Sequence, residues 1–110
     1  MGPTVASFVA LLLFASASSG KGTITGHVRD KDTGRPIAGV TVVAQGPQGE
    51  LAEITDDKGD YTITDAPAGK YLVEFYVAGP VAPRDSRNAV VVADRTAVVV
   101  AAFAQKQDEG

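Results

Sequence analysis

The sequence predicts an all-β sandwich that forms a single domain. Three observations support this prediction. Short apolar or alternating segments recur along the chain, turn signals separate them about every 8–12 residues, and no segment between them has the period of an amphipathic helix. The chain has 110 residues, and this length allows one domain at most.

The predicted strands are bounded by clusters of Gly, Pro, Asp and Asn, which favour turns. Residues 61–64, Tyr-Thr-Ile-Thr, illustrate the pattern, because apolar and polar residues alternate as they do in a half-buried strand. Seven strands are expected, at residues 22–29, 40–44, 51–55, 61–64, 70–77, 88–93 and 96–103. The side chains expected to face the core are those of Ile24, Val28, Val40, Val42, Ile54, Tyr61, Ile63, Tyr71, Val73, Phe75, Val90, Val92, Val99, Ala101 and Phe103.

The N-terminal segment has the composition of a signal peptide. An apolar run from Val5 to Phe14 is followed by Ala15-Ser16-Ala17, an A-x-A cleavage pattern. The run is shorter than the ~20 residues that span a bilayer, and the alternatives are an uncleaved membrane anchor or a buried helix. Export to the periplasm, cell surface or extracellular medium is therefore expected. The expected divisions are a cleaved signal-peptide helix at 1–17, a linker at 18–21, the sandwich at 22–104 and a polar tail at 105–110.

The composition excludes several classes of function. The formal net charge is −3 and no stretch is strongly basic, so binding to nucleic acid is not expected. The chain contains no cysteine, which rules out disulfides, thiol chemistry and thiolate metal sites. No sequence pattern indicates a cofactor.

Four stretches together carry a family resemblance. Gly22–Asp30 and Thr33–Val42 read G-T-I-T-G-H-V-R-D and T-G-R-P-I-A-G-V-T-V, Thr55–Ile63 contains T-D-x-x-G-x-Y-x-I, and Pro67–Phe75 contains P-A-G-x-Y-x-V. In this order they resemble the carboxypeptidase regulatory-like domain. The resemblance implies a seven-stranded Greek-key β-sandwich of the transthyretin or prealbumin-like kind, without catalytic activity. It also implies a setting beside metallocarboxypeptidase domains, in bacterial surface proteins or at the front of outer-membrane receptors.

His27 is the only histidine, and it opens a stretch similar to the start of transthyretin-related 5-hydroxyisourate hydrolases. Those enzymes use further histidine and arginine partners and end in Tyr-Arg-Gly-Ser, a motif that this chain lacks. Hydrolytic chemistry of this kind needs several groups acting together. We therefore expect no catalytic residue, and we interpret His27 as an exposed strand residue.

Two predicted turns are rich in aspartate. If successive strands run antiparallel, both turns lie at the same end of the sandwich, together with the long loop at 78–87. Converging carboxylates there could hold Ca²⁺ through oxygen ligands, whereas in ordinary turns aspartate hydrogen-bonds to the nearby backbone. No complete calcium-loop pattern is present, so we expect no bound metal. The candidate calcium ligands are Asp30, Asp32, Asp56, Asp57 and Asp60.

Lys21, Glu74 and Asn88 are the candidates for an intramolecular isopeptide bond of the kind found in similar Cna-type adhesin sandwiches. Such a bond joins a lysine to an asparagine, and a carboxylate assists. Glu74 lies between Val73 and Phe75 in the alternating pattern, so its side chain is expected to face solvent. We therefore do not expect the bond to form.

Several apolar residues are expected on the outside of the sandwich. The last strand is apolar on both faces, and two residues of the fifth strand alternate with its core residues. Exposed apolar surface commonly marks a contact site for another protein, although valine is also simply favoured in strands. The candidate contact surface consists of Leu72, Tyr76, Val91, Val98 and Val100.

The sequence therefore predicts an exported, non-catalytic module that acts as a structural or protein-interaction domain in the cell envelope. Its expected partner is an envelope protein or a second copy of the chain. The alternative is a carbohydrate-binding module, because the family is grouped with starch-binding-like domains. Sugar platforms rely on exposed aromatic rings. With no Trp in the chain and Tyr61 and Tyr71 assigned to the core, Tyr76 is the one ring expected outside.

Overall fold

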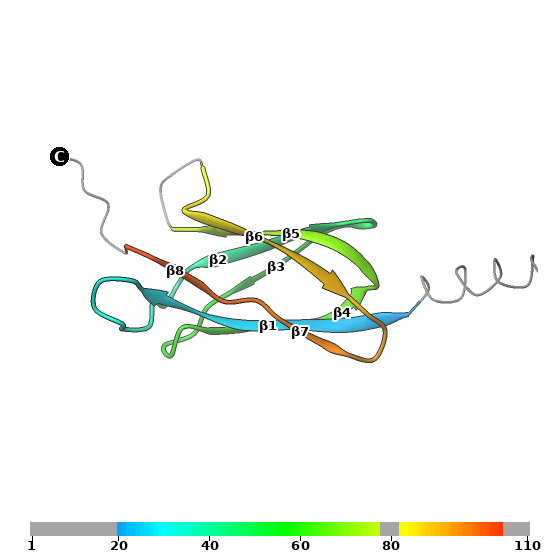
Figure 1. Ribbon diagram of the computed structural model, residues 1–110, viewed down its shortest axis with the longest axis horizontal. Helices are drawn as coiled ribbons and strands as arrows, with labels where there is room; N and C mark the ends of the chain where they lie inside the picture. The colour runs from blue at the N-terminus through cyan, green and yellow to red at the C-terminus, as the bar shows by residue number, and fades with distance from the viewer. Residues whose placement is uncertain (1–19, 78–81, 105–110) are drawn as a thin grey trace, which may run out of the picture.

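The computed structural model describes residues 20–77 and 82–104. The expected signal peptide at 1–17 and polar tail at 105–110 lie outside these residues. The described residues contain no helix, and therefore none that could cross a membrane. They form eight strands (Figure 1): β1 (Lys21–Asp30), β2 (Thr41–Gly46), β3 (Gly49–Ile54), β4 (Asp60–Pro67), β5 (Gly69–Tyr76), β6 (Asp85–Val91), β7 (Thr96–Val98) and β8 (Ala101–Phe103).

The strands form two sheets that pack face to face as a sandwich (Figure 1). The first sheet has the order β4-β1-β7, and β8 also pairs with β1. Within it, β1 is antiparallel to β4 and parallel to both β7 and β8. The second sheet has the order β3-β2-β5-β6, and all of its pairs are antiparallel. The prediction of an all-β sandwich is confirmed.

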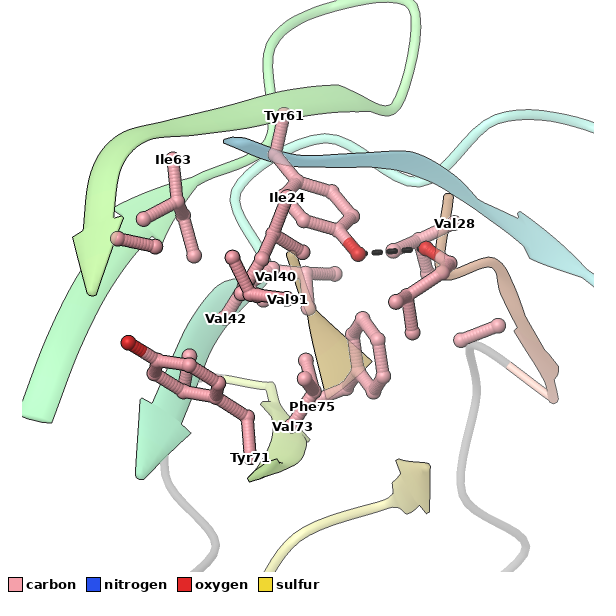
Figure 2. Packing of buried hydrophobic residues seen from close by; sticks show 14 of the residues in the cluster. Ile24, Val28, Val40, Val42, Tyr61, Ile63, Tyr71, Val73, Phe75 and Val91 are labelled. Atoms are coloured by element: carbon pink, nitrogen blue, oxygen red, sulfur yellow. Dashed lines mark hydrogen bonds between the residues drawn. The ribbon is translucent and has the colours of Figure 1, made fainter. Parts of the chain in front are cut away.

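The predicted last strand, 96–103, is two strands, β7 and β8, which raises the strand count from seven to eight. The break lies at Val99, whose carbonyl accepts a hydrogen bond of 2.5 Å from the Tyr61 hydroxyl (dashed line in Figure 2). Opposite the break, β1 carries Gly26, where a Cβ atom would lie 1.8 Å from the same carbonyl oxygen. The Tyr61 hydroxyl therefore binds a backbone carbonyl in the gap between β7 and β8, the two strands that pair with β1 on either side of the break.

One apolar core fills the space between the sheets, and Figure 2 shows most of it. Tyr61 and Phe75 meet edge to face in this core, with ring centroids 6.1 Å apart. Burying such rings contributes strongly to stability. The inward positions confirmed by the structure are Ile24, Val28, Val40, Val42, Tyr61, Ile63, Tyr71, Val73, Phe75, Val99, Ala101 and Phe103.

Three residues expected in the core are exposed. Val90 and Val92 are 60% and 52% exposed, whereas Val91 between them is only 2% exposed. In a run of three valines, alternation does not show which side chains face the core. In the structure Val91 faces the core, whereas the prediction placed Val90 and Val92 there. Ile54 is 61% exposed because it lies opposite Thr41 on the outer face of the second sheet. The core residues missing from the prediction are Ile37, Ala44, Ala66 and Val91.

Candidate functional site

The two aspartate-rich turns lie at the same end of the sandwich, as expected. The N–H of Val28, near the end of β1, donates to the Gly59 carbonyl at 2.8 Å, and the Val28 carbonyl accepts from Ile37 N at 3.0 Å. These bonds join the turn at 56–60 to the segment that follows the turn at 30–36. We call this the acidic end of the sandwich.

Carboxylates at the acidic end bind their own backbone. One oxygen of Asp30 accepts hydrogen bonds from the N–H groups of Asp32 and Thr33. One oxygen of Asp56 accepts from the N–H groups of Asp60 and Lys58, both at 2.9 Å. These two bonds, that of Asp60 first, lower the pKa of Asp56. The two carboxylates therefore stabilise turns.

The calcium hypothesis gains no support from this geometry. The other three candidate ligands, Asp32, Asp57 and Asp60, are exposed. Within residues 20–77 and 82–104, no three acidic or histidine side chains gather as a metal site requires.

Thr55 is a structural residue of the acidic end that the sequence analysis did not single out. Its hydroxyl donates to the Ile37 carbonyl at 2.8 Å and accepts from Val40 N at 2.9 Å. Its own backbone bonds to Gly39 N and to the Val40 carbonyl. Thr55 is only 4% exposed, so this polar side chain is buried with its hydrogen bonds made.

The structure shows where the hydrolase candidate, His27, and the three isopeptide candidates lie. His27 is half-buried on β1, rather than exposed as expected, and its register partner on β4 is Asp60. Lys21 begins β1 in the first sheet, whereas Glu74 lies in the second sheet, where its carboxylate accepts a 2.6 Å hydrogen bond from Gln45 Nε2. Asn88 is the β6 partner of Leu72 in the same second sheet. The structure does not bring these groups together.

The predicted contact surface is divided between different parts of the sandwich. Leu72 and Tyr76 face outward on β5, in the second sheet. Val98 and Val100 are exposed, but they lie at and just after β7, in the first sheet. Val91 is buried in the core and is removed from this surface. The reason is again the inverted alternation of β6.

The outer face of the second sheet is nevertheless partly apolar. Leu72 and Val90 are diagonal neighbours on it, because Leu72 pairs with Asn88 and Lys70 pairs with Val90. Ile54 and Tyr76 flank Thr41 on the same face. Desolvation, followed by the neighbouring Glu74 carboxylate, raises the pKa of Tyr76. We call this surface, defined by Ile54, Leu72, Tyr76 and Val90, the outer apolar face.

A polar groove lies at the opposite end of the sandwich, and the sequence analysis did not predict it. It has a volume of about 390 Å³, and its charged lining residues are Lys21, Asp65, Asp94 and Arg95. The groove is also lined by Thr23, Thr64 and Thr96. We call it the terminal groove. It is far from the acidic turns, because Lys21 and Asp30 are the two ends of β1.

The backbone around the terminal groove has an unusual conformation. Asp65 and Asp94 have φ angles of 57° and 63°, and they are the only non-glycine residues with positive φ among the described residues. Asp65 lies at a bulge, where two residues of β4 oppose one of β1 between the pairs Gly22–Ala66 and Ile24–Ile63. Bulges re-aim side chains and are frequent next to binding sites.

Backbone hydrogen bonds fix the turn at 92–95 against β1. Asp94 N donates to the Lys21 carbonyl at 2.9 Å, and Thr23 N donates to the Arg95 carbonyl at 3.0 Å. The four charged side chains of the groove form no ion pair or side-chain hydrogen bond within the described part of the chain. The groove therefore presents two cations and two anions on an anchored backbone.

Together, the two sheets and their connectivity define a small transthyretin-like β-sandwich. Residues 23–104 match the carboxypeptidase regulatory-like domain family. The chain belongs to that family.

Similar proteins place this fold in several contexts. The TonB-dependent transporter Oar of Myxococcus xanthus is 40% identical over 67 residues, which cover 58% of this chain and 6% of the transporter. The TIE protein of Bacillus anthracis has a TM-score of 0.64 at 20% identity, over 76% of this chain and 16% of that one. A 5-hydroxyisourate hydrolase of Klebsiella pneumoniae has a TM-score of 0.54 at 22% identity, over 72% and 90%. The two structural likenesses show the fold alone.

Proposed function

We propose that this chain is an exported, non-catalytic module that contacts another protein in the cell envelope. The outer apolar face carries the proposal, since three exposed aliphatic side chains, Ile54, Leu72 and Val90, lie on the outside of one sheet. Leu72 and Val90 are diagonal neighbours on this face, and exposed apolar surface commonly marks a protein contact. The transporter relative supports an envelope setting, and the apolar segment at 1–17 supports export.

The absence of a catalytic role is supported by the chemistry of the site candidates. His27 is the single histidine of the sequence, and it lies half-buried in a strand. Multi-residue acid–base catalysis requires a second group within hydrogen-bond reach of the first. The hydrogen bonds within the described residues include none to the His27 ring.

Site-specific photo-crosslinking in the cell tests the proposed contact. A benzophenone amino acid at Leu72 is expected to crosslink one protein, whereas the same group at Thr62, exposed on β4 of the other sheet, is not. Val90→Lys, which changes the neighbouring position without touching the core, is expected to remove the Leu72 crosslink. Equal crosslinking from both positions, or a Leu72 crosslink that survives Val90→Lys, would refute the contact.

A further inference from the structure

The terminal groove contains charged side chains of both signs that have no partners among the described residues. Lys21 and Arg95 supply an ammonium and a guanidinium group, and Asp65 and Asp94 supply two carboxylates. None of the four is paired within residues 20–77 and 82–104. A site with equal numbers of donor cations and acceptor anions is complementary to a ligand that itself carries both charges.

The positions of these charges are set by the backbone. Asp65 lies in the β4 bulge, while Asp94 and Arg95 lie in a turn that is hydrogen-bonded to β1. A non-glycine residue at positive φ is strained where the surroundings impose this conformation, although aspartate tolerates it better than most. The groove thus keeps two carboxylates at positions where glycine would be more relaxed.

A second hollow continues the groove toward β3. It has a volume of about 180 Å³ and shares Lys21 and Asp65 with the terminal groove. Leu51 and Pro67 line it, together with Tyr71, whose hydroxyl is already bonded to the Pro67 carbonyl at 2.6 Å. The hollow therefore adds some apolar surface, from Leu51 and Pro67, beside the polar side chains of Lys21, Gln48 and Asp65.

We propose that the terminal groove binds a free amino acid or short peptide with an apolar side chain. Its ammonium group lies against Asp65 and Asp94, its carboxylate lies against Lys21 and Arg95, and its side chain enters the hollow beside Leu51. The lining charges are exposed, so water and salt compete for them. We expect a dissociation constant of about 1 mM.

This inference is independent of the proposed function. The terminal groove lies at the end of the sandwich, whereas the outer apolar face lies on one sheet, and residues of the groove take no part in that face. Either site can be disproved without affecting the other.

An NMR titration of the full chain tests the inference with three probes. Leucyl-glycine is expected to shift the backbone amides of residues 21–23, 64–65 and 94–96. Two uncharged probes are not expected to shift these amides. They are N-acetyl-leucinamide, which keeps the leucine side chain, and maltose. The inference is overturned if leucyl-glycine leaves those amides unshifted, or if either uncharged probe shifts them equally.

Two variants separate binding from folding. Asp65→Gly and Arg95→Gln are expected to weaken leucyl-glycine binding by about tenfold, while the folded spectrum is retained. Asp57→Asn, which removes one negative charge at the acidic end as Asp65→Gly does in the groove, is the matched control for Asp65→Gly and is expected to bind as the unaltered chain does. Equal weakening by Asp57→Asn would overturn the inference, because it would show a general effect of charge.

Discussion

The two ends of the sandwich use aspartate in different ways. At the acidic end, Asp30 and Asp56 accept hydrogen bonds from their own turns, and the left-handed positions there are taken by Gly34, Gly39 and Gly59. At the groove end, aspartate itself takes the left-handed positions and its carboxylates stay unpaired within the described residues. A turn whose carboxylate is hydrogen-bonded to its own backbone is typical of structural roles. A strained backbone that carries unpaired charged side chains is typical of binding sites.

The largest expected difference between the ends is in the loss of stability when a threonine is replaced by valine. Thr55→Val leaves the buried Ile37 carbonyl and Val40 N–H without the Thr55 hydroxyl, and each unsatisfied buried group costs ~1–3 kcal/mol. We expect a loss of about 2–4 kcal/mol in the free energy of unfolding, measured with urea. Thr64→Val, the same change on the groove lining, is expected to cost less than about 0.5 kcal/mol. Similar losses at both positions would remove the distinction between the ends.

A smaller effect is expected from pH. The pKa of Asp56 is lower in the folded chain than the reference value of 3.8, because backbone N–H groups bind the ionised form. Its contribution to stability is therefore present above pH 3.8 and is lost as the pH falls through the folded-state pKa. Asp56→Asn should unfold at lower urea than the unaltered chain at pH 7, and the gap should narrow below pH 3.8. A gap that stays constant into acid would contradict this assignment.

Much of the fold follows from local sequence patterns. Alternation in the segments around Ile24, Tyr61 and Val73 identifies the buried face correctly, because polar residues separate the apolar ones. The pattern fails at Val90-Val91-Val92, where every position is apolar and the face is undetermined. It also fails at Ile37, which follows a predicted turn, is buried, and has its carbonyl hydrogen-bonded by Thr55, a residue distant in the chain.

The candidate site was less predictable than the fold. The terminal groove combines residues from β1, the β4 bulge and the turn before β7, and no local pattern joins these three segments. Asp94-Arg95 is recognisable as a turn from sequence, but a positive φ at aspartate is not. The aspartate-rich turns were candidate sites because of their composition, yet the Asp56 carboxylate accepts hydrogen bonds from backbone N–H groups. Clusters of charge in the sequence therefore do not by themselves identify a binding site.

The most direct test of this contrast is one substitution made at both ends, followed by urea unfolding at pH 7. Asp56→Gly removes a carboxylate that holds two backbone N–H groups, and it should lower the unfolding midpoint. Asp65→Gly removes a carboxylate that has no partner in the described part of the chain and relaxes a φ of 57°, so the midpoint should stay unchanged or rise. If Asp65→Gly lowers the midpoint as much as Asp56→Gly does, Asp65 is a structural residue and the contrast between the ends is wrong.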